Sequence, residues 1–109
     1  MNDKDIPLAN SKVRYKTLLI EEDYAVSQTT VLPGGETEWH HHTKVRDRFV
    51  VVQGVLTVET KAGALVDTRR VDDHYTVEPG VIHHVRNETL HDVVYINIQS
   101  GGERDIVLA

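Results

Sequence analysis

Short runs of residues rich in Val, Ile, Thr and Tyr cover most of the chain, and Gly, Pro, Asp and Asn interrupt them at close intervals. This pattern is typical of β-strands joined by tight turns, and it leaves almost no segment for a helix. We predict strands at residues 13–20, 24–32, 38–42, 49–53, 55–60, 65–71, 74–77, 82–86, 93–99 and 105–108.

The breaks between the predicted strands contain the residues that tight turns favour. We expect Gly34, Gly54 and Gly80 to supply turns with positive φ, which glycine adopts without steric cost. Regular short strands separated in this way predict an all-β sandwich or barrel. A chain of 109 residues is the usual size of one domain. We therefore expect an N-terminal arm at residues 1–12 and a single domain at residues 13–109.

Composition and charge exclude several classes of protein. A formal net charge of −5 without a clustered basic surface argues against binding to nucleic acid. The chain has no cysteine, so neither a disulfide nor a thiolate metal site can form. The first ten residues lack the apolar core of a signal peptide, and no apolar run approaches the ~20 residues that span a bilayer. We expect a cytoplasmic protein with no nucleic-acid or membrane partner.

Histidine is clustered. Five of the seven histidines fall in two groups, His40-His41-His42 and His83-His84. Such a grouping can arise by chance on a surface, but imidazole is also the commonest metal ligand in proteins. In a strand, residues two positions apart share a face, so His40 and His42 point together while His41 points away. The same rule places His83 on the inward side if Arg86 faces solvent.

A carboxylate stands close to the first histidine group in the sequence. Asp47 shares a face with Phe49 and Val51 in the following strand, which would bring it beside the imidazoles across the intervening turn. A purely structural role for Asp47 is the alternative, either capping that turn or pairing with Arg46 or Arg48. The pattern therefore indicates three neutral nitrogens and one carboxylate oxygen as candidate metal ligands.

Two motifs resemble those of the cupin superfamily. Gly34, His40, His42, Asp47 and Gly54 have the spacing of the first cupin motif, although Glu is usual where Asp47 stands. The two motifs and the strands around them cover about two thirds of the chain.

Gly80, His83 and Asn87 have the spacing of the second cupin motif. In this chain, however, Pro79 directly precedes the glycine, whereas the proline of the motif stands two places before it. The resemblance identifies a small one-domain cupin and implies a double-stranded β-helix, or jelly-roll barrel. It also implies a divalent metal ion in the mouth of that barrel. The positions that match the family's ligands are His40, His42, Asp47 and His83.

A metal with this ligand set keeps one or two positions for water, substrate or dioxygen. The set accepts Fe²⁺, Mn²⁺, Ni²⁺, Co²⁺, Cu²⁺ or Zn²⁺, and the sequence does not choose among them. The leading hypothesis is an oxygenase that acts on a small metal-chelating substrate, with Asp47 as the candidate catalytic residue. A Lewis-acid isomerase, lyase or cyclase, in which Asp47 moves a proton, is the second hypothesis. A ligand-binding protein without turnover is the third.

Apolar residues also occur on the second face of the predicted sheet, opposite the side that carries the candidate ligands. A covered face would explain them, and a second copy of the chain is the simplest cover. We therefore expect a homodimer that binds a small-molecule substrate. The apolar residues in question are Val50, Val52, Val55, Ile82 and Val94.

Overall fold

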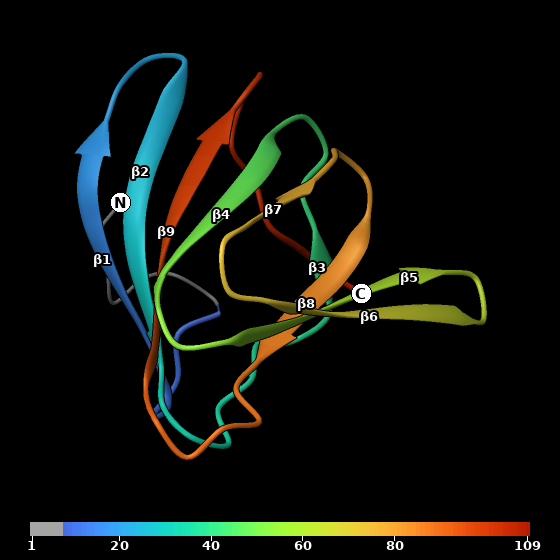
Figure 1. Ribbon diagram of the computed structural model, residues 1–109. Helices are drawn as coiled ribbons and strands as arrows, with labels where there is room; N and C mark the ends of the chain where they lie inside the picture. Colours follow the sequence, from blue (N-terminus) through green and yellow to red (C-terminus); the bar gives the residue numbers. More distant parts are fainter. Residues whose placement is uncertain (1–7) are drawn as a thin grey trace.

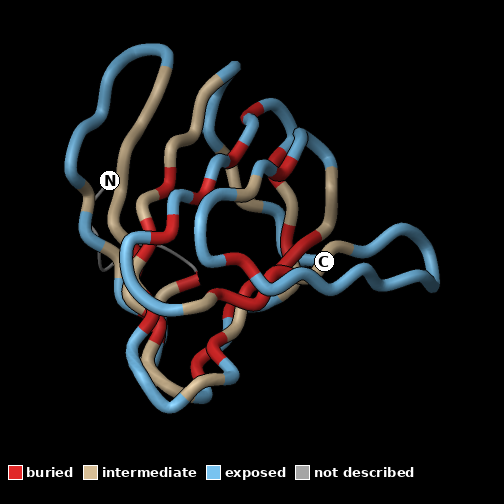
Figure 2. The backbone as a smooth tube through the Cα atoms, in the orientation of Figure 1, coloured by how far each residue is buried: buried red, intermediate tan, exposed pale blue. Residues whose placement is uncertain are grey.

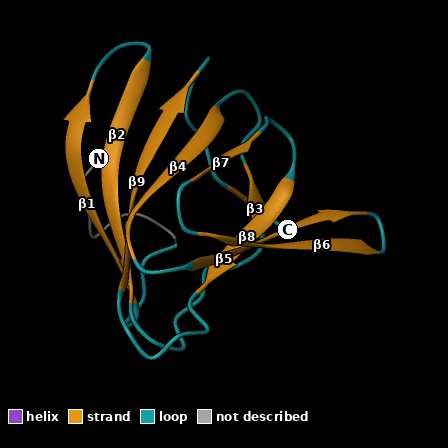
Figure 3. Ribbon diagram, viewed as in Figure 1, coloured by secondary structure: helices purple, strands orange, loops and turns teal. Residues whose placement is uncertain are grey.

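The structure is a computed structural model in which residues 8–109 are described, and strands form nearly all of its regular structure (Figure 3). No helix occurs in this range, as the sequence pattern predicted. Accordingly, the described chain contains no helix long and apolar enough to cross a membrane. The strands are β1 (Val13–Ile20), β2 (Tyr24–Val31), β3 (His40–His41), β4 (Arg46–Gln53), β5 (Leu56–Ala62), β6 (Leu65–Val71), β7 (His74–Val77), β8 (Ile82–Arg86), β9 (Val93–Ser100) and β10 (Val107–Leu108).

The strands form two antiparallel five-stranded sheets that face one another (Figure 1). The first sheet has the order β1-β2-β9-β4-β7, and the second has the order β10-β3-β8-β5-β6. This arrangement confirms the predicted all-β jelly roll, although its two sheets are not closed into a ring. Within residues 8–109 the edge strands β6 and β7 each pair with a single neighbour, so no ladder joins the two sheets into a ring. The architecture is a two-sheet jelly roll.

Every predicted strand has a counterpart in the structure, although β3 and β10 are shorter than predicted and β4 starts earlier. The structure begins β4 at Arg46, whereas the predicted strand begins at Phe49, although the sequence already places Asp47 on the same face as Phe49. In β4, however, exposed and buried residues alternate strictly from the first position, and Asp47 is buried between two exposed arginines. The strand period therefore prevails over residue type at this position.

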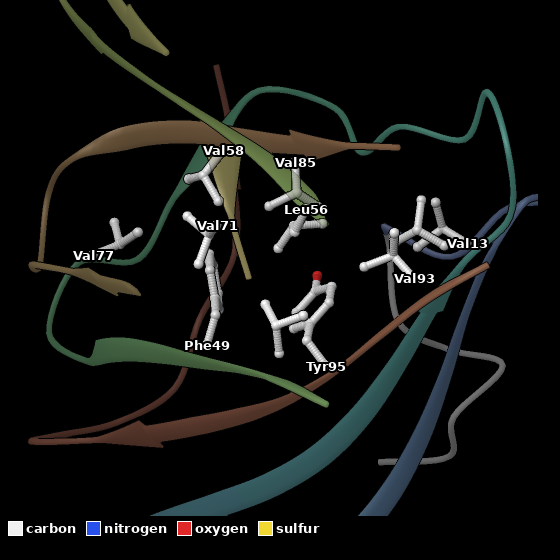
Figure 4. Close-up of a cluster of buried hydrophobic side chains, with 11 residues drawn as sticks. Val13, Phe49, Leu56, Val58, Val71, Val77, Val85, Val93 and Tyr95 are labelled. Carbon is white, nitrogen blue, oxygen red and sulfur yellow. The ribbon is translucent and has the colours of Figure 1, made fainter. Parts of the chain in front are cut away.

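The hydrophobic core fills the space between the sheets, and side chains from both inner faces contribute to it (Figure 4). Phe49 of the first sheet and Leu56 of the second are almost completely buried. Close packing of this kind holds the two sheets at a fixed separation. The core consists of Val13, Val31, Phe49, Val51, Leu56, Val58, Val71, Val77, Val85, Val93 and Tyr95.

Two peripheral regions differ from this pattern. The β5–β6 hairpin extends away from the body of the molecule, and every residue of β6 except Val71 is exposed (Figure 2). Residues 1–7 of the expected N-terminal arm lie outside the described residues, but Leu8 is buried and lines the cavity between the sheets. On the outer face of the first sheet, Val50 and Val52 are 39% and 60% exposed. A homodimer that covers this face stays a prediction.

Replacing Leu56 by Ala should lower the free energy of unfolding by about 2–5 kcal/mol, because it leaves a cavity in a packed interior. Urea denaturation followed by circular dichroism measures this change. Leu65→Ala is the matched control, since Leu65 is 78% exposed in the hairpin and should change stability by less than about 0.5 kcal/mol. Equal losses in the two variants would contradict the assignment of the core.

Candidate metal centre

Three histidines meet on the inner face of the second sheet. His40 lies in β3 directly opposite His83 of the neighbouring strand β8, and His42 follows β3 immediately. All three side chains are buried, with exposed fractions of 4% or less. His84 points to the other side of the sheet, where its ring stacks on Trp39 with centroids 4.1 Å apart. Antiparallel pairing thus brings together histidines that are some forty residues apart in the chain.

The three rings are close enough to share one ion. Each contributes a ring nitrogen, and these nitrogens all lie within 4.8 Å of one another. The ring centroids are 4.2 Å apart for His40 and His83, 5.2 Å for His40 and His42, and 5.4 Å for His42 and His83. The cluster could therefore hold a metal ion.

Every ring in the cluster is held by its Nδ1 atom. A backbone carbonyl lies within hydrogen-bonding distance of each Nδ1, which fixes the proton there and turns Nε2 toward the centre of the cluster. The pairs are His40 with Glu38 O at 2.7 Å, His42 with Asp105 O at 2.6 Å and His83 with Val81 O at 2.8 Å.

Two of the three inward nitrogens lack a hydrogen bond. Nε2 of His42 and Nε2 of His83 are buried without a hydrogen bond. A buried polar atom left without a partner costs free energy, and a bound cation would remove that cost. Three neutral imidazoles are a donor set that suits Zn²⁺, Cu²⁺, Fe²⁺ and Ni²⁺. The residues therefore fit a divalent transition-metal ion, without selecting one.

Asp47 lies beside the cluster but outside it. One of its oxygens is 3.4 Å from Nε2 of His42, and no carboxylate belongs to the group whose donor atoms converge. Asn97 and Gln99 of β9 donate to its two oxygens at 3.2 and 3.4 Å. The Asn97 side chain is in turn fixed by a 2.6 Å hydrogen bond from Thr29. Asp47 is thus a buried carboxylate held by amides next to three imidazoles.

The alternative of a structural pair with a neighbouring arginine finds no support in the contacts. Arg46 pairs with Glu78 at 3.0 Å, on the exposed side of β4. Arg48 is exposed on the same side, while Asp47 faces the interior. The carboxylate is therefore directed toward the histidines.

The environment separates the pKa values of the three histidines. Burial and the neighbouring His83 lower the pKa of His40 to about 4. Burial also lowers the pKa of His83. For His42, burial acts in the same direction, but the contact with Asp47 and the hydrogen bond to Asp105 outweigh it and raise the pKa above 6.5. Without metal, His42 is therefore the ring that carries a proton on both nitrogens most readily.

A cavity of about 770 Å³ opens onto this cluster. Phe49 and Val85 form apolar parts of its wall, and Tyr15 and Tyr95 also line it. Burial is the largest cause that raises the pKa of both tyrosines, so their hydroxyls stay protonated at neutral pH. The volume suits a small molecule.

Sequence reasoning missed the polar residues that hold Asp47. A signal for Asn97 existed, because it shares a strand face with Val93 and Tyr95 and so places an amide on an apolar inner face. Gln99 continues the same face. No sequence pattern indicates Asp105, because it holds His42 through its backbone carbonyl, which any residue type would supply.

The separated pKa values predict a distinctive titration of the metal-free protein. His40 should titrate near pH 4 and His42 above pH 6.5, as followed by the C2-proton resonances in NMR spectra. Unfolded histidine binds its proton near pH 6.5. The folded protein therefore binds fewer protons at His40 between pH 6.5 and 4, and the contribution of His40 to stability is lost as the pH falls through this window.

His42 has the opposite effect. Its contribution to stability is complete below pH 6.5 and is lost as the pH rises through its raised pKa in the folded state. A common titration of all three imidazoles near pH 6.5 would contradict the described environment.

Comparisons with known proteins agree with this architecture. A protein with a double-stranded β-helix domain from Klebsiella pneumoniae superposes with a TM-score of 0.79 at 20% identity, covering 98% of this chain and 92% of that one. CapF, the capsular polysaccharide assembling protein of Staphylococcus aureus, superposes with a TM-score of 0.81 at 18% identity, covering 94% and 34%. An oxalate oxidase in complex with glycolate gives 0.76 at 16%, covering 98% and 58%.

At these identities the superpositions show the fold alone, a double-stranded β-helix, and the predicted cupin fold is confirmed. This chain spans about a third of CapF and a little over half of the oxalate oxidase. No curated protein sequence matches it significantly. A model of the family described as mannose-6-phosphate isomerase C-terminal matches residues 9–108, which is nearly the entire chain. The protein therefore belongs to this family of cupin-type domains.

Proposed function

We propose that the protein is a metal-dependent enzyme that acts on a small molecule, with His40, His42 and His83 as the ligands of one divalent transition-metal ion. The observation that carries this proposal is the orientation of the three buried rings. Each is held at Nδ1 by a carbonyl, and their remaining nitrogens converge at the base of a cavity. Core packing alone does not account for buried imidazole nitrogens that converge on one point.

In this proposal, Asp47 accepts and returns a proton instead of completing the ligand set. Its carboxylate is already engaged by Asn97 and Gln99, and Asp is one methylene shorter than the Glu usual at this position of the motif. A fixed, buried carboxylate 3.4 Å from a ligand imidazole is placed to take a proton from a substrate that enters the cavity. Three nitrogen ligands on a six-coordinate ion leave room for a chelating substrate and a further small molecule.

The reaction that we propose is the oxidation of a small chelating acid, enol or diketone by dioxygen. When bound, Fe²⁺ would supply the redox chemistry that dioxygen requires. The chain itself supplies an apolar wall at Phe49 and Val85 that keeps bulk water away. Tyr15 and Tyr95 offer protonated hydroxyls that can orient a polar substrate. The same fold occurs in an oxalate oxidase whose structure contains glycolate, a small hydroxy acid.

A Lewis-acid isomerase, lyase or cyclase is the second candidate, and the position of Asp47 favours it. A carboxylate beside the ligands and outside their cluster is suited to moving a proton between two carbons of a substrate whose carbonyl is polarised. The description of the matching family names an isomerase. Reaction under anaerobic conditions distinguishes the two candidates.

Substituting the proposed ligands tests the metal site. His40→Ala, His42→Ala and His83→Ala should each weaken the binding of Co²⁺ or Zn²⁺ by more than the ~10–100-fold that loss of an outer-shell partner costs. His41→Ala is the matched control and should bind as the wild type does, because His41 faces the other side of the sheet. Asp47→Ala should weaken binding less than the histidine changes do. Isothermal titration of the metal-free protein gives the constants, and loss of binding in His41→Ala with retention in His42→Ala would refute the assignment.

The proposed reaction is tested with two metals in two atmospheres. The Fe²⁺ form should consume dioxygen when it is mixed with a panel of small enols, diketones, thiols and phenolic acids, as recorded by an oxygen electrode. The Zn²⁺ form should be inactive, because oxidation needs a metal that exchanges electrons. Anaerobic turnover with Zn²⁺ would favour the Lewis-acid candidate. Saturable binding of a panel member without product in either atmosphere would indicate a ligand-binding protein.

A further inference from the structure

We propose that Asp105 is a positioning residue for His42, and that the segment carrying it couples the wall of the cavity to the metal centre. This segment, residues 102–106, joins β9 to β10 and is called the strap below. The coupling to metal rests on the proposed function, whereas the positioning of the His42 ring can be tested in the metal-free protein.

Asp105 contacts two consecutive residues at the centre. Its backbone carbonyl lies 2.6 Å from Nδ1 of His42 and accepts the proton there. Its carboxylate accepts the backbone N–H of Thr43 at 2.8 Å and the Thr43 hydroxyl at 2.6 Å. One residue therefore fixes both the ring of His42 and the backbone that follows it. Because the side chain of Asp105 anchors its own carbonyl, loss of the carboxylate should loosen the hydrogen bond to the ring.

This arrangement differs from that of the other two rings. His40 and His83 are held by carbonyls only two positions earlier in the sequence, which follow directly from local strand geometry. The carbonyl that holds His42 comes from 63 residues later in the chain. The orientation of His42 therefore depends on the docking of the strap, and that of the others does not.

Among residues 8–109, a short strand pairing and a few backbone contacts also hold the strap in place. The chain leaves the first sheet after β9 and crosses to the edge of the second, where β10 pairs with β3 through two residues (Figure 1). Those residues, Val107 and Leu108, are 38% and 50% exposed, and the N–H of Ala109 donates to the carbonyl of Trp39 at 3.0 Å. At the start of the strap, Gly102 packs so closely on Lys44 that an added Cβ would lie 2.8 Å from the Lys44 Cβ. The contact between Asp105 and Thr43 is thus a major anchor of the strap.

The strap is also part of the cavity wall. Each of its five residues lines the cavity, and Arg104 is the one lysine or arginine among the described lining residues. A metal ion that fixes the ring of His42 should also favour the docked strap. In turn, the docked strap favours the orientation in which His42 can bind the metal. Such coupling is reciprocal by thermodynamic necessity. Metal binding should therefore order this part of the wall before a substrate enters.

The test compares Asp105→Ala and Asp105→Asn with the matched control Asp67→Ala. Asp67 is an exposed aspartate of β6 whose carboxylate pairs with Arg69, away from the centre. NMR of the metal-free protein records the Nδ1 proton of His42, and Co²⁺ titration gives the metal affinity. In Asp105→Ala the Nδ1 proton should exchange with water fast enough to disappear, and Co²⁺ affinity should fall roughly tenfold, the lower end of the range for outer-shell partners. Asp105→Asn should restore part of the Nδ1 proton signal and part of the Co²⁺ affinity. The control Asp67→Ala should change neither quantity.

Hydrogen exchange provides the second measurement. Co²⁺ should slow backbone exchange across the strap in the wild type, and this effect should shrink in Thr43→Val, which keeps Asp105 but removes one hydrogen bond. An unchanged Nδ1 signal in Asp105→Ala would overturn the proposal, and so would a lower melting temperature with unchanged Co²⁺ affinity. If the wild type binds no Co²⁺ at all, the proposed metal site and the coupling fail together. The Nδ1 signal would still decide the positioning of His42.

Discussion

The antiparallel pairing of β3 with β8 is the interaction on which the centre depends. It sets His40 directly opposite His83 and turns both rings inward, because paired residues in an antiparallel ladder share a face. Their Nδ1 atoms then reach carbonyls of the same segments, so the backbone that aligns the strands also orients the rings. A shift of one residue in the pairing would set His84 opposite His40 and direct His83 to the other side of the sheet. The chemistry of the site is thus a consequence of strand register.

Electrostatics reinforces this geometry. Three imidazoles within a few ångströms cannot all be protonated, and burial adds to the penalty, so His40 and His83 favour their neutral forms. Asp47 counteracts this tendency at all three rings, but only at His42, where Asp105 also contributes, does the upward shift of the pKa prevail. Two rings therefore favour the neutral form that binds a cation, while the third keeps its second proton to a higher pH. The three histidines thus differ in pKa because their surroundings differ.

Much of the fold and part of the site follow from sequence periodicity. Nearly all strand positions could be predicted, and so could the inward direction of His40, His42 and His83, because the period of two is a local property. The predicted start of β4 is three residues too late, because charged residues are uncommon in strands, although the face of Asp47 is predicted correctly. The open seam between the sheets and the contact from Asp105 to His42 depend on how distant segments dock, which no local pattern records.

The projecting β5–β6 hairpin has a practical consequence. Its turn contains Gly63, which has open space around it but a φ of +62° that favours glycine, and the strand that follows is exposed almost throughout. Exposed tips of this kind tolerate inserted sequence best. A peptide tag or a fluorophore-bearing cysteine could be introduced there to immobilise or report on the protein. Since the natural chain has no cysteine, such a thiol would be a unique attachment point.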